Sequence, residues 1–185
     1  MTPSPAVRIR GTTQGDLAAL PALERSAAAS FRGIPELAWI ADDDVTSEAE
    51  HAAYIRAGTS WVIEDASVDG GASPVLGFLC AEVFEDALHV WELSVHGDHQ
   101  GRGLGRRLLA HAIDHARRTG LPAVTLTTFT DVPWNAPFYA RVGFAIIPSI
   151  APGSRLAEVL DHERDLGLPV DRRCAMRLSL SDDRG

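Results

Sequence analysis

The stretch Glu92-Leu-Ser-Val-His-Gly-Asp-His-Gln-Gly-Arg-Gly-Leu-Gly-Arg-Arg107 contains the most informative local pattern of this chain. An alternating run of residues ends at Val95, and glycines follow at every second position, Gly101, Gly103 and Gly105. An amphipathic pattern starts directly after them and places these apolar residues on one helical face: Leu104, Leu108, Leu109, Ala112, Ile113 and Ala116. This order predicts a strand, a glycine-rich turn and a helix.

A turn of this kind favours the binding of an anion. The first turn of a helix has amide N–H groups without an intrahelical partner, and the helix dipole is positive at that end. Glycine lets the backbone adopt a positive φ and come close to a bulky ligand. Arg102, Arg106 and Arg107 add formal positive charge. A phosphate or pyrophosphate is therefore the expected ligand, and a glycine-rich connection that binds nothing is the alternative.

Two common phosphate-binding motifs do not fit the spacing of this stretch. A P-loop needs a lysine followed by serine or threonine after its last glycine, and neither pair follows here. A dinucleotide-binding motif that starts at Gly101 needs its third glycine at the position of Arg106. Both motifs are excluded.

The pattern Gln100-x-x-Gly103-x-Gly105 resembles the Gln/Arg-x-x-Gly-x-Gly/Ala signature of the GNAT N-acetyltransferase superfamily. The preceding residues, 92–96, resemble the fourth strand of that family. In GNAT proteins this turn surrounds the pyrophosphate of acetyl-CoA. The resemblance therefore implies acetyl-CoA as cosubstrate, with these cofactor-binding residues: Leu93, Ser94, Val95, Gln100, Gly101, Arg102, Gly103, Leu104, Gly105 and Arg106.

A second motif lies downstream, at Trp134–Phe144. Asn135 and Tyr139 are four residues apart and are expected to share one face of a short helix that ends at Gly143. The segment resembles the GNAT pattern that ends in Phe-Tyr-x-x-x-Gly-Phe, in a shortened form. The resemblance implies that Asn135 bonds the pantetheine arm and that Tyr139 lies near the CoA sulfur as the general acid. Phe138 is a further cofactor-binding candidate, with a place in the core as the alternative.

The periodicity along the chain, read together with this resemblance, predicts an α/β fold. We expect a single GNAT-like domain over residues 1–185, with a central mixed, mostly antiparallel sheet that is splayed between strands four and five and flanked by helices. A loose N-terminus is expected at 1–6 and a helical insertion at 151–167. Strands are predicted at 7–10, 61–64, 75–85, 87–95, 124–128 and 173–180, and helices after Thr13 and at 47–57, 104–119 and 152–166.

Three segments between these elements carry expectations of their own. Pro21 lies inside the first helical pattern and is expected to break or kink it. Residues 33–44 are acidic and expected to be irregular, with Phe31 and Trp39 as candidates for the acceptor pocket or for the core. The segment 65–74 contains Gly70-Gly71 and is predicted to be a hairpin connection.

Acetyl transfer to an amine needs a base, an oxyanion donor and an acid. An alkylamine with a pKa near that of lysine, about 10.4, is almost entirely protonated at neutral pH. Glu92 is the first candidate base, because the family often has a carboxylate here, and His89 is the second. A structural role is the alternative for Glu92, and a surface strand position for His89. The resemblance makes the backbone N–H of Leu93 the oxyanion donor and Tyr139 the proton source for the thiolate.

Metal and thiol chemistry find little support in the sequence. His111 and His115 have the spacing of metal ligands on a helix but lack the glutamate of the HExxH motif, so a solvated face is expected for them and no metal. Cys80 and Cys174 lie in apolar runs without metal-ligand spacing and are expected to be reduced core thiols.

Composition restricts the partners. The net charge of −8 argues against nucleic acid and permits steering of a cationic substrate. The chain has no apolar run of membrane-spanning length and its first residues lack the apolar core of a signal peptide, so a cytoplasmic setting without a membrane partner is expected.

The sequence thus predicts an acetyltransferase that moves the acetyl group of acetyl-CoA to a primary amine of a small molecule by direct transfer in a ternary complex. The alternatives are a protein or peptide N-acetyltransferase, an enzyme with another acyl donor or an alcohol acceptor, and a GNAT-like module that binds acyl-CoA without turnover. A homodimer is common in the family and is compatible with the sequence.

Overall fold

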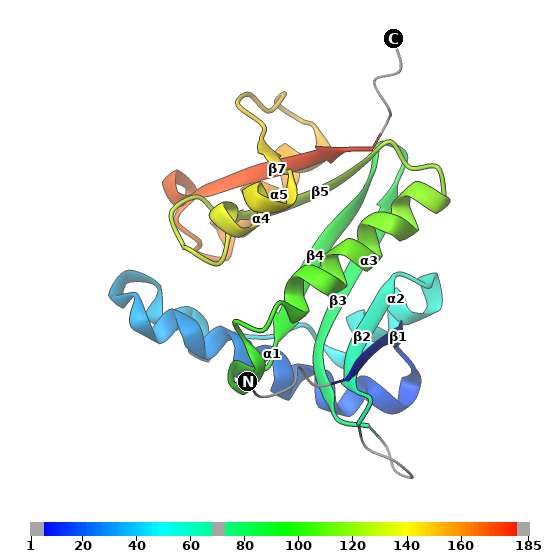
Figure 1. Ribbon diagram of the computed structural model, residues 1–185. Helices are drawn as coiled ribbons and strands as arrows, with labels where there is room; N and C mark the ends of the chain where they lie inside the picture. Colours follow the sequence, from blue (N-terminus) through cyan, green and yellow to red (C-terminus); the bar gives the residue numbers. More distant parts are fainter. Residues whose placement is uncertain (1–5, 68–72, 181–185) are drawn as a thin grey trace. The chain divides into compact units, whose positions relative to one another are not determined.

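The computed structural model describes residues 6–67 and 73–180 and forms a seven-stranded mixed sheet flanked by helices (Figure 1). The strand order is β1-β2-β3-β4-β5-β7-β6. The strands are β1 (Val7–Gly11), β2 (Ser60–Asp65), β3 (Val75–Phe84), β4 (Ala87–Val95), β5 (Ala123–Phe129), β6 (Ala145–Ile146) and β7 (Arg173–Ser179). The predicted α/β class is confirmed.

The sheet is mostly antiparallel, with one parallel pair. β1 and β2, β2 and β3, β5 and β7, and β6 and β7 pair antiparallel, whereas β4 and β5 run parallel. The parallel ladder joins Leu88 to Val124 and His89 to Thr125, while β4 continues to Val95 and β5 to Phe129. So short a ladder agrees with the expected splay between these two strands.

The helices begin and end close to the predicted positions. They are α1 (Leu20–Ala28), α2 (Glu48–Ala57), α3 (Leu104–Arg118), α4 (Ala136–Val142) and α5 (Arg155–Asp165). Short 3-10 helices are η1 (Gln14–Ala19), η2 (Ala29–Gly33), η3 (Pro35–Asp42), η4 (Gly97–His99) and η5 (Val170–Arg172). Pro21 lies just after the change from η1 to α1, where a residue without an N–H is tolerated. The prediction of irregular structure at 33–44 was wrong, because most of that segment forms η3.

Backbone contacts divide the chain into two compact units. Unit 1 joins Met1–Glu82 with Glu92–Asp114, and unit 2 joins Val83–Trp91 with His115–Gly185. The strands β3 and β4 and the helix α3 run through both. The hairpin predicted at 65–74 and the loose N-terminus predicted at 1–6 lie partly outside the described residues.

Unit 1 packs α1 and α2 around an apolar cluster. Its fully buried members include Leu20 of α1, Val62 of β2 and Phe78 of β3. The side chain of Ser47 accepts a hydrogen bond from the Glu50 amide in the first turn of α2, which fixes where that helix begins. An added Cβ at Gly77 of β3 would lie 2.8 Å from the Ser94 carbonyl oxygen, so glycine lets β3 come close to β4 at this point.

Unit 2 is built on the long β5–β7 ladder, which pairs every residue from Ala123 to Phe129 with β7. The helix α5 is tied to this ladder by Glu163, whose carboxylate accepts hydrogen bonds from Arg173 of β7 and Thr127 of β5. Gly143 ends α4 with φ 113°, as predicted from its position.

None of the helices in the described ranges combines the length and apolar character that crossing a membrane requires.

Candidate active site

The glycine-rich turn of unit 1 has the geometry of an anion site. Gly101 and Gly103 adopt positive φ values of 72° and 79°, which disfavour other residues, and both are exposed. Among the described residues, no heavy atom lies within 4 Å of a Cβ added at either glycine. The helix α3 begins directly afterwards, so its first amides face the same turn. These residues fit a pyrophosphate.

The turn is fixed by hydrogen bonds that sequence reasoning did not predict. Gln100 donates from Nε2 to the Val95 carbonyl at 3.0 Å and accepts from the Ser30 hydroxyl at 3.0 Å. The Gly97 amide donates to the Ser26 hydroxyl at 3.0 Å. Ser26 and Ser30 come from α1 and η2, so the N-terminal helices of unit 1 position the turn. Gln100 therefore orients the backbone rather than standing free for a ligand.

The remaining turn residues differ in what they can present to a ligand. Arg102 and Arg106 are exposed and can contact phosphates directly. Arg107 donates to the Val7 carbonyl at 3.2 Å, which ties part of its guanidinium to β1. The Leu104 side chain is buried in the core, so this residue can offer a ligand only its backbone.

The end of β4 carries the predicted base and oxyanion donor in unit 1. Glu92, Leu93 and Val95 are half-buried, whereas Ser94 is buried. The Ser94 hydroxyl donates to Glu92 Oε1 at 2.7 Å, which orients the carboxylate.

A second carboxylate, that of Glu24 of α1, interacts electrostatically with Glu92. Burial, followed by the negative charge of Glu92, raises the pKa of Glu24 to about 8 from an ordinary value of 4.5. Sequence reasoning missed this residue. The available signal was its position next to Leu20, Leu23 and Ala27, since an acid on the apolar face of a helix is unusual.

Unit 2 contains Asn135, Phe138 and Tyr139 around α4. Asn135 precedes the helix, and its Oδ1 accepts from the Thr128 hydroxyl at 2.7 Å. Its carbonyl accepts from the Tyr139 amide at 3.1 Å. Asn135 was predicted to lie in the same short helix as Tyr139, and it is instead the residue before the first turn of that helix. The Tyr139 ring packs edge-on against Phe138 and Phe144 at centroid distances of 5.0 and 5.8 Å.

His89 lies in unit 2 in a setting that keeps its imidazole neutral. Its side chain is fully buried, and Nδ1 lies 3.0 Å from the Thr125 hydroxyl. Burial, with the positive charge of Arg155, lowers the pKa of His89 to about 3. The alternative of a surface strand histidine was therefore wrong. An imidazole this weakly basic stays in its neutral form, with a single ring N–H, at neutral pH.

The aromatic candidates for the acceptor pocket have different surroundings. Phe31 is half-buried and Trp39 is 40% exposed. Trp61 is buried and stacks edge-on against His111 at 5.6 Å, which makes both part of the packing of unit 1. His111 and His115, predicted on a solvated face, are both half-buried.

Two further features of the described residues bear on the site. Within 6–67 and 73–180, no group of three or more His, Cys, Asp or Glu side chains is placed to hold a metal ion. Cys80 and Cys174 are buried free thiols, as predicted.

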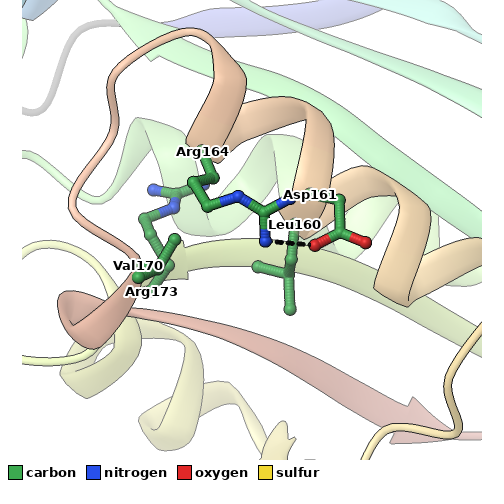
Figure 2. A pocket seen from close by; sticks show the side chains of 5 residues that line it. All are labelled: Leu160, Asp161, Arg164, Val170 and Arg173. Carbon is green, nitrogen blue, oxygen red and sulfur yellow. Dashed lines mark hydrogen bonds and ion pairs between the residues drawn. The ribbon is translucent and has the colours of Figure 1, made fainter.

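A pocket of about 160 Å³ lies beside α5 in unit 2, lined by Leu160, Asp161, Arg164, Val170 and Arg173 (Figure 2). Its charges are already paired, because Arg164 bonds Asp161 at 2.6 Å and Arg173 bonds Glu163 at 2.7 Å. None of the predicted site residues lines it.

Comparisons with known proteins identify relatives of this chain. The N-acetyltransferase ycf52 of Gracilaria tenuistipitata var. liui, itself uncharacterised, is 36% identical over 64 residues, which are 35% of this chain and 34% of that protein. The chain therefore spans about a third of the length of this curated relative.

Solved structures show the same fold. Rv2747 from Mycobacterium tuberculosis, in complex with CoA and NLQ, is 21% identical with a TM-score of 0.65 over 94% of this chain and 99% of its own. The protein yncA from Salmonella typhimurium, with its cofactor acetyl-CoA, is 22% identical with a TM-score of 0.64 over 97% of each chain.

The model of the acetyltransferase (GNAT) family matches residues 24–144, more than half of the chain. This match contains the glycine turn, the end of β4 and the segment around Tyr139. The chain belongs to the GNAT acetyltransferase family.

Proposed function

We propose that this protein transfers the acetyl group of acetyl-CoA to a primary amine of a small molecule, directly and in a ternary complex. The observation that carries the proposal is the exposed turn at Gly101 and Gly103, whose positive φ values and first α3 amides suit a pyrophosphate. Family membership supports an acetyl donor. The acidic net charge of −8 supports a cationic acceptor, in preference to an anionic one.

Acetyl-CoA would supply an activated thioester, and the chain's residues would bind it, orient it and move protons. The first amides of α3 and the guanidinium groups of Arg102 and Arg106 would hold the pyrophosphate. Asn135 would hold the pantetheine arm. Phe138 is a further cofactor contact by the same resemblance.

Three residues would carry the chemistry. Glu92 would take a proton from the amine, since its carboxylate is half-buried and oriented by Ser94. The Leu93 amide would donate to the developing oxyanion, and Tyr139 would protonate the leaving thiolate. Glu92 is preferred over His89 as the base because the buried imidazole beside Arg155 is too weakly basic.

Thermal unfolding with and without acetyl-CoA tests the cofactor site. Binding to the native state must raise its stability, by about 2.7 kcal/mol when the ligand is at a hundred times its Kd. The variant Gly103→Val should lose this shift. Gly120→Val is the matched control, because Gly120 has nearly the same φ, 76°, also with open space around an added Cβ, but lies at the other end of α3. A wild type without a shift contradicts the proposal.

Turnover tests the acid. Tyr139→Phe should reduce thiol release in the presence of amines by about a hundredfold or more while the acetyl-CoA Kd stays nearly constant. Wild-type activity in this variant would remove Tyr139 from the mechanism. Binding of acetyl-CoA without turnover of any amine would favour the non-catalytic alternative, and activity restricted to peptide N-termini or lysines would favour the protein acetyltransferase.

A further inference from the structure

We propose that Glu24 is a second catalytic carboxylate, which together with Glu92 binds the ammonium group of the acceptor and receives its proton. The inference rests on the proposed function and adds to it a second residue that binds the cationic primary amine.

Glu24 is held in unit 1 by neutral groups only. Its side chain, 13% exposed, accepts hydrogen bonds from the Thr46 amide at 3.2 Å to each carboxylate oxygen and from the Thr46 hydroxyl at 3.4 Å. Within the described ranges no arginine forms an ion pair with it. A carboxylate buried in this way keeps most of its capacity to bind a cation, because a threonine supplies no compensating charge.

His51 of α2 provides a second observation, separate from the two carboxylates, that favours a bound polar group at this position. Its side chain is fully buried, and in the described part of the chain neither Nδ1 nor Nε2 has a hydrogen-bond partner. Nε2 lies 4.0 Å from Glu24 Oε2, while the ring packs edge-on against Phe78 at 5.0 Å. Buried polar atoms are nearly always hydrogen-bonded, so a polar group bound beside Glu24 would give this nitrogen the hydrogen-bond partner that it lacks among the described residues.

The neighbouring titratable groups are acidic or neutral. The charges of Glu92 of β4 and Glu50 of α2 act on Glu24, His51 of α2 lies 4.0 Å from it, and Glu24 in turn acts on Cys80 of β3. Burial lowers the pKa of His51, which keeps it neutral, although Glu50 opposes the shift. Burial, with the charges of Glu92 and Glu24, raises the pKa of Cys80. This environment therefore favours a positively charged ligand.

The pair of acids is suited to proton transfer at neutral pH. Burial and the charge of Glu92 place the pKa of Glu24 at about 8, so near neutrality Glu24 is largely protonated when no cation is bound. A bound ammonium favours the fully ionised pair and displaces that proton. A base with a pKa near the working pH is the most effective one.

One turnover removes two protons from the nitrogen of the acceptor. The ammonium gives one proton to Glu24, and the amine nitrogen then forms the C–N bond to the thioester carbon as the C–S bond breaks. The second nitrogen proton passes to Glu92, and the thiolate takes the proton that the proposed function assigns to Tyr139. One of the two transferred protons returns to Tyr139 through solvent and the other leaves, so the products are the amide, CoA and one proton.

The test compares Glu24→Gln with wild type on two acceptors of similar shape, phenethylamine, which is cationic at neutral pH, and O-benzylhydroxylamine, which is not. The variant should lose about a hundredfold in kcat/KM for phenethylamine and little for O-benzylhydroxylamine. The rise of kcat/KM with pH through about 8 should also disappear. If Glu24 has a purely structural role, the variant loses the same factor in kcat/KM for both acceptors and keeps the wild-type pH profile. Glu48→Gln, which removes an exposed charge at the start of α2, is the control.

A measurement without any acceptor separates this inference from the proposed function. In protein labelled with ¹³C at glutamate carboxyls, one resonance should titrate near pH 8, vanish in Glu24→Gln and move to lower pH in Glu92→Gln. If no glutamate titrates above its ordinary range, or if Glu24→Gln retains the wild-type profile on phenethylamine, the inference is overturned and the acetyltransferase function stands. If wild type acetylates no amine although the carboxyl titrates near 8, the proposed function fails, and the inference fails with it.

Discussion

Unit 1 buries an acid, Glu24, next to another acid, whereas unit 2 buries a base, His89, next to a cation, Arg155. Both groups are pushed towards their neutral forms by the same two causes, loss of water and a neighbour of like charge. The two pKa values have different consequences for proton transfer. The pKa of Glu24, about 8, lies where protons exchange near neutrality, and that of His89, about 3, lies far outside this range.

The contacts around His89 and around Glu24 also differ. His89 and Arg155 share the Thr125 hydroxyl, at 3.0 and 3.3 Å, and Arg155 also lies over the Phe84 ring at 4.2 Å and bonds Asp86 at 3.2 Å. This cluster joins α5 to the sheet by protein groups. Each cluster also contains buried polar atoms without a hydrogen-bond partner among the described residues, both ring nitrogens of His51 in one and Nε2 of His89 with Nε and Nη1 of Arg155 in the other. We regard the His89 cluster as structural and the Glu24 cluster as functional because only the pKa of Glu24 lies near neutrality.

The largest effect expected from this contrast is on turnover. Glu92→Gln should lower kcat for amine acetylation by about 10²–10⁴, because the acidic pair loses the carboxylate that we propose as the base. His89→Gln should leave kcat and its pH dependence unchanged. Steady-state thiol release with both variants measures this, with the acetyl-CoA Kd of each as the control for folding. A large loss of kcat in His89→Gln alone would reverse the assignment of the two clusters.

The next effect is on stability as pH rises from 4.5 to 8. The folded-state pKa of Glu24, about 8, is above its ordinary value of 4.5, so its contribution to stability is fully present below 4.5 and is lost as pH rises through 8. The loss is on the order of 1 kcal/mol for each pH unit within that window. Urea unfolding should show that Glu24→Gln is less sensitive to rising pH than wild type. An identical slope in both proteins would mean that Glu24 is ionised in the native state.

Unit 2 should respond at acid pH, with the opposite sign. The folded-state pKa of His89, about 3, is below its ordinary value of 6.5, so stability is lost as pH falls from 6.5 through 3. The slope is again on the order of 1 kcal/mol for each pH unit. His89→Gln should start from a lower stability at neutral pH, because it disturbs a buried hydrogen bond, and then fall less steeply on acidification. A parallel fall would show that another group dominates acid unfolding.

The parts of the fold and site that the sequence predicted are those controlled by local geometry. Gly101 and Gly103 have the positive φ that the motif required, Gly143 ends α4, and Ser47 with Glu50 starts α2. Backbone conformation at such positions depends on a few neighbouring residues, so periodicity and turn chemistry are sufficient.

The parts that could not be predicted depend on residues far apart in the chain. Glu24 and Glu92, and His89 and Arg155, are brought into interaction only when strands and helices pack, and no spacing rule connects them. His89 was the second candidate base because its residue type suits that role. The structure gives it an arginine neighbour from α5, a helix outside the two motifs. Sequence patterns therefore locate the cofactor turn better than they locate proton-transfer groups.

A smaller effect is expected at Asn135, whose side chain accepts a hydrogen bond from Thr128 within unit 2. Asn135→Ala removes the acceptor of the Thr128 hydroxyl, so we expect a loss of about 1 kcal/mol in the free energy of unfolding. If Asn135 also holds the pantetheine arm, as the family resemblance implies, the acetyl-CoA Kd rises as well. Thr128→Val is the control, since it breaks the same contact without removing the amide. An unchanged Kd in Asn135→Ala would leave this residue with its structural role alone.

The smallest effect tests why His89 is neutral. Arg155→Gln removes the cation beside the imidazole but leaves His89 buried, and burial is the larger of the two causes that lower its pKa. The pKa of His89 should therefore rise in this variant and still stay below its ordinary value, as measured by NMR titration of the ring protons. A full return to the ordinary value would mean that Arg155, rather than burial, keeps the imidazole neutral. In that case the contrast between the two units would arise from their neighbouring charges, and a single arginine on α5 would be what separates a structural histidine from an available base.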